Sequence, residues 1–90
     1  MKCFQLKIKG KVQGVWFRGS TKQIAEELGL KGFVRNEPDG SVYVEGEGDE
    51  LKLTAFIEWC KKGPQLARVI DVEWEEVPLK NYKIFEVIRH

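Results

Sequence analysis

Hydrophobic residues recur with two different spacings along the chain, and each spacing predicts one type of element. Near the N-terminus, Phe4, Leu6 and Ile8 alternate with Gln5 and Lys7, which is the pattern of a strand with one buried face. We expect this strand to end near Gly10–Lys11. Farther on, Ile24, Ala25 and Leu28 are spaced three and four residues apart, and this spacing predicts a helix.

The first helix is predicted over residues 20–29. Ser20 with Gln23 three residues later matches a capping box, and Gly29 supplies the end. Residues 31–36 read as a short strand, which the turn Pro38-Asp39-Gly40 follows. Val42 and Val44 alternate with Tyr43 and Glu45, so a third strand closes a hairpin.

A second helix is predicted after Asp49, which is a suitable N-cap. Its buried stripe has the spacing i, i+3, i+4, i+7 and consists of Leu53, Phe56, Ile57 and Cys60. Gly63-Pro64 ends it. The alternation over 69–77 predicts a strand with Ile70, Val72 and Trp74 on one side, and a last strand is expected over 83–89.

This order of elements predicts an α+β fold of the ferredoxin-like βαββαβ sandwich type. Its sheet is mostly antiparallel, with two helices on one face. The chain has 90 residues, fewer than the roughly 100–150 of a common domain. Residues 1–90 are therefore expected to form a single domain.

Charge and composition narrow the classes of function. The 15 Lys and Arg residues nearly balance the 14 Asp and Glu residues, for a net charge of +1. This balance argues against binding nucleic acid through counterion release. The chain has no apolar run long enough to span a membrane and no apolar stretch typical of a signal peptide near its start. A cytoplasmic location and no membrane partner are predicted.

The cysteines and the histidine limit the chemistry further. Cys3 and Cys60 are far apart, and the only histidine is His90, at the end of the chain. A zinc site needs about four ligands, and a nucleophilic triad needs a positioned imidazole. Catalysis is therefore expected to use other side chains or backbone amides. The two cysteines are predicted on opposite sides of the sheet, without a disulfide.

The predicted topology brings two segments to one edge of the sheet. A right-handed crossover makes the first two strands parallel, with the third strand between them, so their ends are two strand spacings apart, roughly 10 Å. The loop from Gly14 to Arg18 follows one strand and Asn36 ends the other. Loop amides at a helix N-terminus cradle anions, and arginine suits phosphate. A carboxamide holds a water molecule. A site for a small phosphorylated ligand is predicted.

The same residues resemble the acylphosphatase family. The family's first signature, G-x-V-Q-G-V-x-F/Y-R, is present as Gly10-Lys-Val12-Gln13-Gly14-Val15-Trp-Phe17-Arg18. The second, G-aromatic-small-x-N-x-x-x-G-x-V, is present as Gly32-Phe33-Val34-Arg35-Asn36-Glu-Pro-Asp-Gly40-Ser-Val42. The length and the order of elements also match, so the resemblance covers essentially the whole chain. Trp16 is bulkier than the residue that many relatives carry there.

The resemblance implies hydrolysis of the carboxyl-phosphate bond of small acyl phosphates. Arg18 would be catalytic and would hold the phosphoryl group together with the backbone amides of Gln13, Gly14, Val15, Trp16, Phe17 and Arg18. Asn36 would orient the attacking water. The implied enzyme is a monomer without metal or organic cofactor, and inorganic phosphate would be both product and inhibitor.

Several other residues are expected to have simpler, structural roles. Gly14 is expected at positive φ, and Arg35 is expected in solvent on the opposite side of its strand from Asn36. Ser20, Thr21 and Ser41 are interpreted as a cap and hydroxyl supports. The aromatic residues interpreted as core or sheet cover are Phe33, Phe56, Trp59 and Trp74.

Two alternative functions remain open. An RNA-binding module shares this strand order but needs exposed aromatics and a basic face. The outward positions on the central strands are Gln5, Lys7, Tyr43 and Glu45, which supply one aromatic and mixed charge. A non-catalytic phosphate-binding domain is the other alternative.

The segment Gly46-Glu47-Gly48 does not predict a dinucleotide site. It lacks the third glycine of the dinucleotide-binding motif, and its strand belongs to a hairpin, not to a Rossmann unit.

Overall fold

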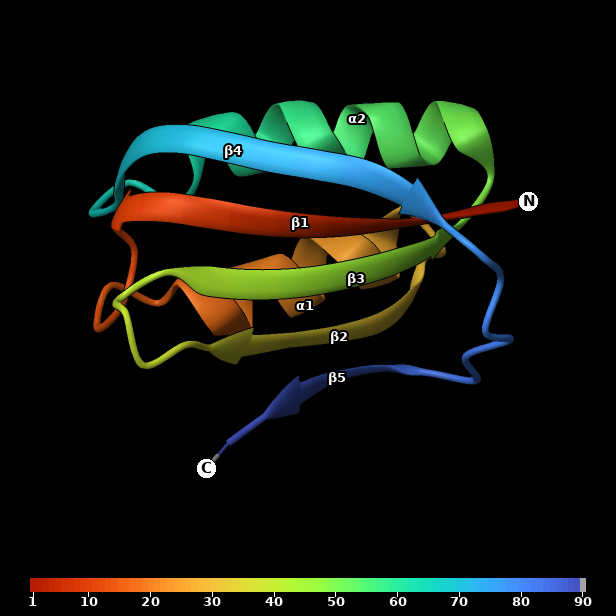
Figure 1. The fold of residues 1–90 in the computed structure, drawn as a ribbon, viewed down its shortest axis with the longest axis horizontal. Helices are drawn as coiled ribbons and strands as arrows, with labels where there is room; N and C mark the ends of the chain where they lie inside the picture. The colour runs from red at the N-terminus through yellow and green to blue at the C-terminus, as the bar shows by residue number, and fades with distance from the viewer. Residues whose placement is uncertain (90) are drawn as a thin grey trace.

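Five strands and two helices make up residues 1–89, the part of the chain that the computed structural model describes. His90, and with it the expectation for its imidazole, lies outside the described residues. The elements are β1 (Lys2–Lys11), α1 (Phe17–Glu27), β2 (Lys31–Asn36), β3 (Val42–Gly48), α2 (Glu50–Lys62), β4 (Arg68–Val77) and β5 (Phe85–Ile88). Both helices lie on one side of the sheet (Figure 1). The predicted ferredoxin-like α+β fold is confirmed.

The sheet has the order β4-β1-β3-β2-β5. β3 lies between β1 and β2 and pairs with both in antiparallel register, as predicted. β5 adds a parallel edge strand beside β2, in which Gly32 pairs with Phe85 and Arg35 with Ile88. The ends of β1 and β2 therefore meet the start of α1 at one edge of the molecule.

The core fills the space between the sheet and the helices. Leu6, Ile8, Val34 and Val44 supply the sheet side of the core cluster. The predicted stripe of α2 is buried, which confirms the helical spacing. Asp49 caps this helix because its carboxylate accepts hydrogen bonds from the amides of residues 51 and 52 at 2.9 and 3.4 Å.

The start of α1 differs from the prediction. The helix begins at Phe17, because Trp16 adopts a left-handed conformation with φ 66° and acts as the N-cap. The amide of Ser20 donates to the Trp16 carbonyl at 3.0 Å, so Ser20 lies inside the first turn. The capping-box prediction is wrong. The end of the helix agrees better, because Gly29, at φ 73°, donates its amide to Glu26 at 3.1 Å.

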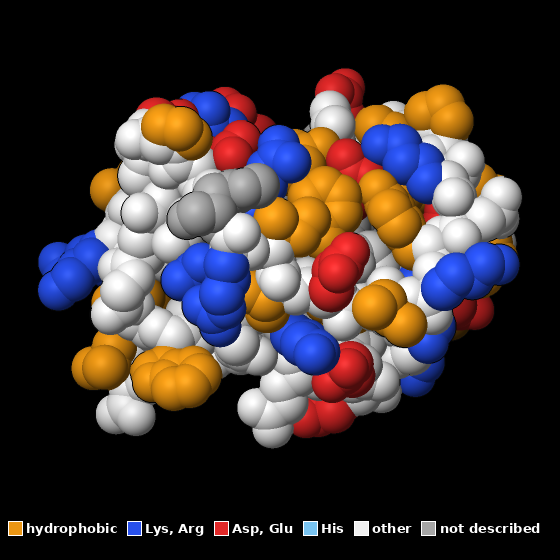
Figure 2. All heavy atoms as spheres, turned by 90° about the horizontal axis from the view of Figure 1, so that it is seen from below, with side chains coloured by type: hydrophobic (Ala, Val, Ile, Leu, Met, Phe, Trp, Pro, Cys, Tyr) orange, Lys and Arg blue, Asp and Glu red, His pale blue; other side chains and the backbone are white. Residues whose placement is uncertain are grey.

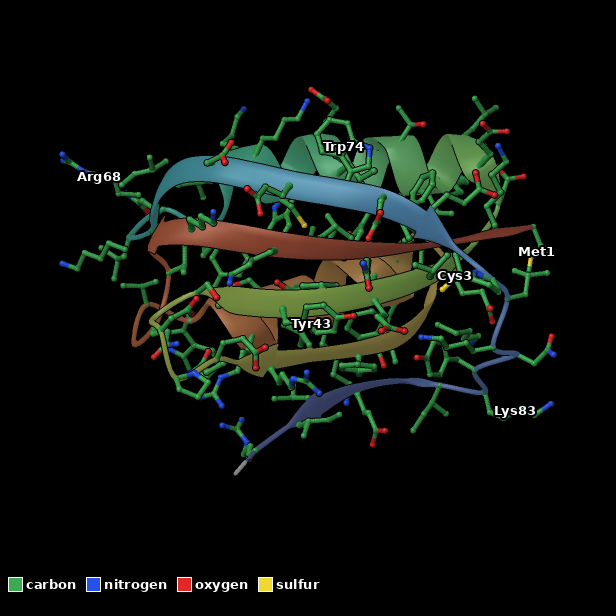
Figure 3. The ribbon with its side chains drawn as sticks, in the orientation of Figure 1. Met1, Cys3, Tyr43, Arg68, Trp74 and Lys83 are labelled. Atoms are coloured by element: carbon green, nitrogen blue, oxygen red, sulfur yellow. The ribbon has the colours of Figure 1, made fainter. Side chains whose placement is uncertain are left out.

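β4 also departs from simple alternation. The register of β1 and β4 shifts between Lys9 and Gly10, and Gly10 pairs with Val69. As a result Val69 packs against the core, whereas Ile70, predicted on the same side as Val72 and Trp74, is 78% exposed. Trp74 lies beside α2 (Figure 3), with the ammonium group of Lys61 4.9 Å from its ring centre.

The sheet face opposite the helices is partly covered. Glu45, predicted to point outward, is buried, and so is Glu47. The chain joining β4 to β5 crosses this face. There the amides of Lys80, Asn81 and Tyr82 donate to the Glu47 carboxylate. Cys3 is buried on this side and Cys60 in the core, both as free thiols.

Hydrogen bonds to the Glu45 and Glu47 carboxylates lower their pKa values more than burial raises them. Burial alone would raise the pKa of Glu45, but donors from Lys80, Tyr43 and Tyr82 hold that pKa below its ordinary value. For Glu47, burial is likewise opposed by the three backbone amides, and its pKa is lowered. Both groups are therefore ionised at neutral pH and hold the crossing segment to the sheet.

Candidate active site

The loop between β1 and α1 has a backbone suited to an anion. Gly14 has φ 74°, as predicted, and Trp16 has φ 66°. Left-handed residues at alternate positions direct successive amides inward to form a concave nest for anions. Val12 and Val15 are buried in the core and anchor the two sides of this loop. The loop is thereby held in place although its tip is exposed.

The N-terminus of α1 presents free donors to the same place. The amides of Phe17, Arg18 and Gly19 have no partner within the helix, as in the first turn of any α-helix. No side chain caps this end, and none of the first-turn residues, all of them within the described chain, is acidic. The positive end of the helix dipole therefore meets no compensating negative charge from its own turn.

Arg18 and Asn36 lie in one cavity. Asn36 ends β2 two residues after Val34, so its side chain is on the helix side of the sheet, toward α1. The cavity measures about 250 Å³ and is lined by Val12, Gly14, Trp16, Phe17, Arg18, Gly19, Asn36 and Arg89. Of the residues singled out from the sequence, Gln13 and Val15 do not line it.

Asn36 carries an unusual polar atom. Its Oδ1 is buried, and no hydrogen-bond donor for it exists among residues 1–89. Leaving a buried carbonyl oxygen unpaired costs about 1–3 kcal/mol, so such an atom is rarely retained without a role. Asn36 itself lines the cavity that is also bordered by the Arg18 guanidinium and the start of α1.

The side chain of Gln13 does more than the sequence indicated. Its Nε2 donates to the carbonyl oxygens of Glu37 at 2.8 Å and Ser41 at 2.9 Å. These two residues flank the turn between β2 and β3, which begins directly after Asn36. Gln13 thus connects the loop that carries the amides to the strand end that carries the carboxamide. Its place in the first signature was the only signal for this role.

Arg35 is 34% exposed, so it is only partly in solvent, and it has partners that the expectation did not include. Its Nε donates to the Glu37 carboxylate at 3.1 Å, and its guanidinium carbon lies 4.8 Å from the ring centre of Tyr43 and 5.5 Å from that of Phe33. The pair stays on the face away from the helices, as the strand parity requires. The predicted side was right, and contacts with Tyr43 on the neighbouring strand and Phe33 on the same strand explain why the side chain is only partly exposed.

A second cleft adjoins the first. It measures about 590 Å³ and is lined by Arg18, Arg35, Asn36, Glu37, Pro38 and Ile88. Arg18 and Asn36 border both spaces. A ligand that places its anionic group in the smaller cavity can therefore extend its remaining part into the larger cleft, with the two side chains at the junction.

In the described part of the chain, no three His, Cys, Asp or Glu side chains gather in an arrangement that could bind a metal ion. Neither α1 nor α2, the helices found in residues 1–89, is long and apolar enough to cross a lipid bilayer.

A ferredoxin-like sandwich with free helix amides, an arginine and an unpartnered carboxamide at one edge has the features that suit a small phosphate-binding protein. The family model described as Acylphosphatase matches residues 4–87. The acylphosphatase of Archaeoglobus fulgidus is 46% identical over 87 residues, covering 97% of this chain and 98% of that protein. The chain therefore belongs to the acylphosphatase family.

Solved structures agree with this result. The acylphosphatase of Bacillus subtilis superimposes with a TM-score of 0.96 at 32% identity, covering 99% of this chain and all of the other. The acylphosphatase of Coxiella burnetii gives 0.94 at 39% identity, with 97% and 92% covered. The predicted family and enzyme class, a hydrolase of acyl phosphates, are thereby confirmed.

Proposed function

We propose that residues 1–90 act as a single catalytic domain in which Arg18 and Asn36 divide the work of acyl phosphate hydrolysis. Arg18 and the backbone amides of Gln13 to Arg18 bind the phosphoryl oxygens. Asn36 orients the attacking water through its Oδ1. The substrate is a small acyl phosphate, and its acyl group extends into the cleft beside Arg35 and Ile88.

The proposed reaction needs positioning and charge stabilisation more than acid–base chemistry. Water attacks phosphorus, the bond between phosphorus and the carboxyl oxygen breaks, and the electron pair leaves with the carboxylate. One proton of the attacking water passes to a phosphoryl oxygen, so the products are the carboxylate and inorganic phosphate. Because a carboxylate is a good leaving group, no strong general acid is required. Donors fixed around the phosphoryl oxygens stabilise the charge that develops on them, as in other phosphoryl transfers.

The observation that carries this proposal is that Asn36, whose Oδ1 is buried and unpartnered, lines the same cavity as Arg18. A water molecule that donates one hydrogen to this oxygen is held close to a phosphoryl group on Arg18. Holding reactants in such a geometry accounts for a large part of enzymatic rate enhancement. The neutral amide also avoids the repulsion that a carboxylate would exert on an anionic substrate.

The proposal also covers the location, oligomeric state, cofactor requirement and inhibition of the domain. The domain acts in the cytoplasm as a monomer, without metal or organic cofactor, and inorganic phosphate competes with the substrate. A non-catalytic phosphate-binding role is the main alternative, and the orphan acceptor favours catalysis over it. The RNA-binding alternative has less support, because Arg35 on the open sheet face is already paired with Glu37.

Hydrolysis of benzoyl phosphate by purified variants tests the assignment. Arg18→Ala and Asn36→Ala should each lower kcat by about 10²–10³-fold, the usual effect of removing one transition-state contact. Arg18→Ala should also abolish competitive inhibition by inorganic phosphate. Arg68→Ala, which changes an exposed arginine outside the cavity, is the matched control and should keep wild-type turnover. Near-wild-type kcat in Arg18→Ala with an intact fold would overturn the assignment.

A further inference from the structure

β5 brings one more residue to the edge where β2 ends. The two strands are parallel, and the last pair in their register joins Arg35 to Ile88. The residues that follow, Asn36 and Arg89, therefore leave the sheet side by side. Side chains alternate along a strand. Arg89 consequently has the same parity as Phe85, which is buried in the core, and its side chain is on the helix side.

Arg89 borders the same cavity as Arg18. The cavity has two guanidinium groups and no carboxylate among its described lining residues. Neither arginine forms an ion pair with a side chain of residues 1–89. Figure 2 views the molecule from the β5 edge and shows basic side chains over both sides of this face, with acidic side chains among them. The described lining of the cavity thus carries two positive side chains in a chain with a net charge of only +1.

We propose that Arg89 is a second phosphoryl-binding residue, and that it makes the site selective for doubly negative phosphoryl groups over singly charged anions. This inference rests on the proposed function. Arg18 supplies one positive charge, whereas a phosphate monoester carries about −1.5 to −2 at neutral pH. A second guanidinium at the same cavity balances the remaining charge. Its planar donors suit phosphoryl oxygens.

Arg89 acts on binding more than on the chemical step. It follows the last residue of β5 and is exposed, so solvent screens its charge more than that of a buried group. Arg18, in contrast, belongs to the first turn of α1 and is half-buried. Removal of Arg89 should therefore raise the KM for benzoyl phosphate and the inhibition constant of phosphate, each by about 5- to 10-fold, with kcat changed less than about threefold.

The experiment compares Arg89→Ala, Arg89→Lys and Lys83→Ala at constant ionic strength and pH 8. Lys83→Ala removes the same charge from an exposed position at the opposite end of the molecule (Figure 3), so it measures the effect of net charge alone. Arg89→Lys keeps the charge without the planar donors and should fall between wild type and Arg89→Ala. Thermal melts of all three variants verify that the fold is intact.

Two inhibitors of fixed charge test the selectivity. Sulfate is a dianion and nitrate a monoanion at pH 8, so neither titrates in the assay. In Arg89→Ala the inhibition constant of sulfate should rise about 5- to 10-fold and that of nitrate less than about twofold. If Arg89→Ala and Lys83→Ala shift these constants equally, or if sulfate and nitrate weaken in parallel, the proposal is wrong.

Failure of this inference is distinguishable from failure of the proposed function. Absence of benzoyl phosphate turnover in the wild type would refute the function. Calorimetric titration of the wild type and of Arg89→Ala with inorganic phosphate would still report whether Arg89 contributes to anion binding. Wild-type turnover combined with unchanged anion affinity in Arg89→Ala would refute only the role of Arg89.

Discussion

The two hydrogen bonds of Gln13 offer a direct test of how the site is assembled. Its Nε2 spans from the loop to the carbonyl oxygens of Glu37 and Ser41 at 2.8 and 2.9 Å. Gln13→Ala removes both bonds and leaves the backbone otherwise unchanged. The loop then loses its polar tie to the turn that follows Asn36. Stability and turnover should both respond, and their magnitudes follow from the structure.

The loss of stability depends on which hydrogen bonds the two carbonyl oxygens still accept in the variant. Glu37 still accepts from the amide of Gly40 at 3.1 Å, and Ser41 still accepts from the amide of Glu37 at 2.9 Å. Neither oxygen is left without a partner, so the loss is the net value of two ordinary hydrogen bonds, about 1–2 kcal/mol in total. For a chain of this length, such a loss lowers Tm by about 5–15 °C.

Turnover should fall for a geometric reason. Arg18 belongs to the first turn of α1 and Asn36 to the end of β2, and small misplacements of reacting groups have large effects on rate. We expect kcat for benzoyl phosphate to fall by about tenfold at a temperature where the variant is fully folded. Urea unfolding and steady-state hydrolysis measure the two effects. Gln23→Ala, which changes an exposed glutamine on α1, is the control. The reasoning fails if Gln13→Ala behaves like this control in both assays.

Two further predictions concern the buried groups away from the site. The pKa values of Glu45 and Glu47 are lowered in the folded state, so their contribution to the free energy of unfolding is complete above the ordinary carboxylate pKa and is lost as pH falls through the lowered values. Glu47→Gln should flatten the loss of stability below about pH 4.5 and lower stability at pH 7, as measured by urea unfolding across pH; an unchanged acid profile would contradict this role. Burial raises the pKa of the Cys3 thiol to about 11 and raises that of the Cys60 thiol further. Both thiols should therefore react with a thiol reagent at pH 8 only as fast as the protein opens. Prompt labelling of the native protein would contradict their burial.

Local patterns in the sequence anticipated much of the fold. The alternation around Phe4 and Leu6, the stripe of α2 and the Asp49 cap depend on neighbours within a few residues, and all three agree with the structure. The juxtaposition of Arg18 and Asn36 also followed from the sequence, because the handedness of a crossover places two strand ends at one edge. The roles of the two residues remain predictions until the variants are assayed.

The tertiary structure alone decided features that depend on distant partners. The early start of α1 requires the left-handed Trp16, which no capping pattern indicates. The alternation of the strand predicts that Glu45 points outward. Its burial depends on Lys80 and Tyr82, which are more than thirty residues away in the sequence. Arg89 reaches the cavity only through the parallel pairing of β5 with β2. Periodicity and motifs report local conformation, whereas these positions are set by strand pairing and by contacts between segments far apart in the chain.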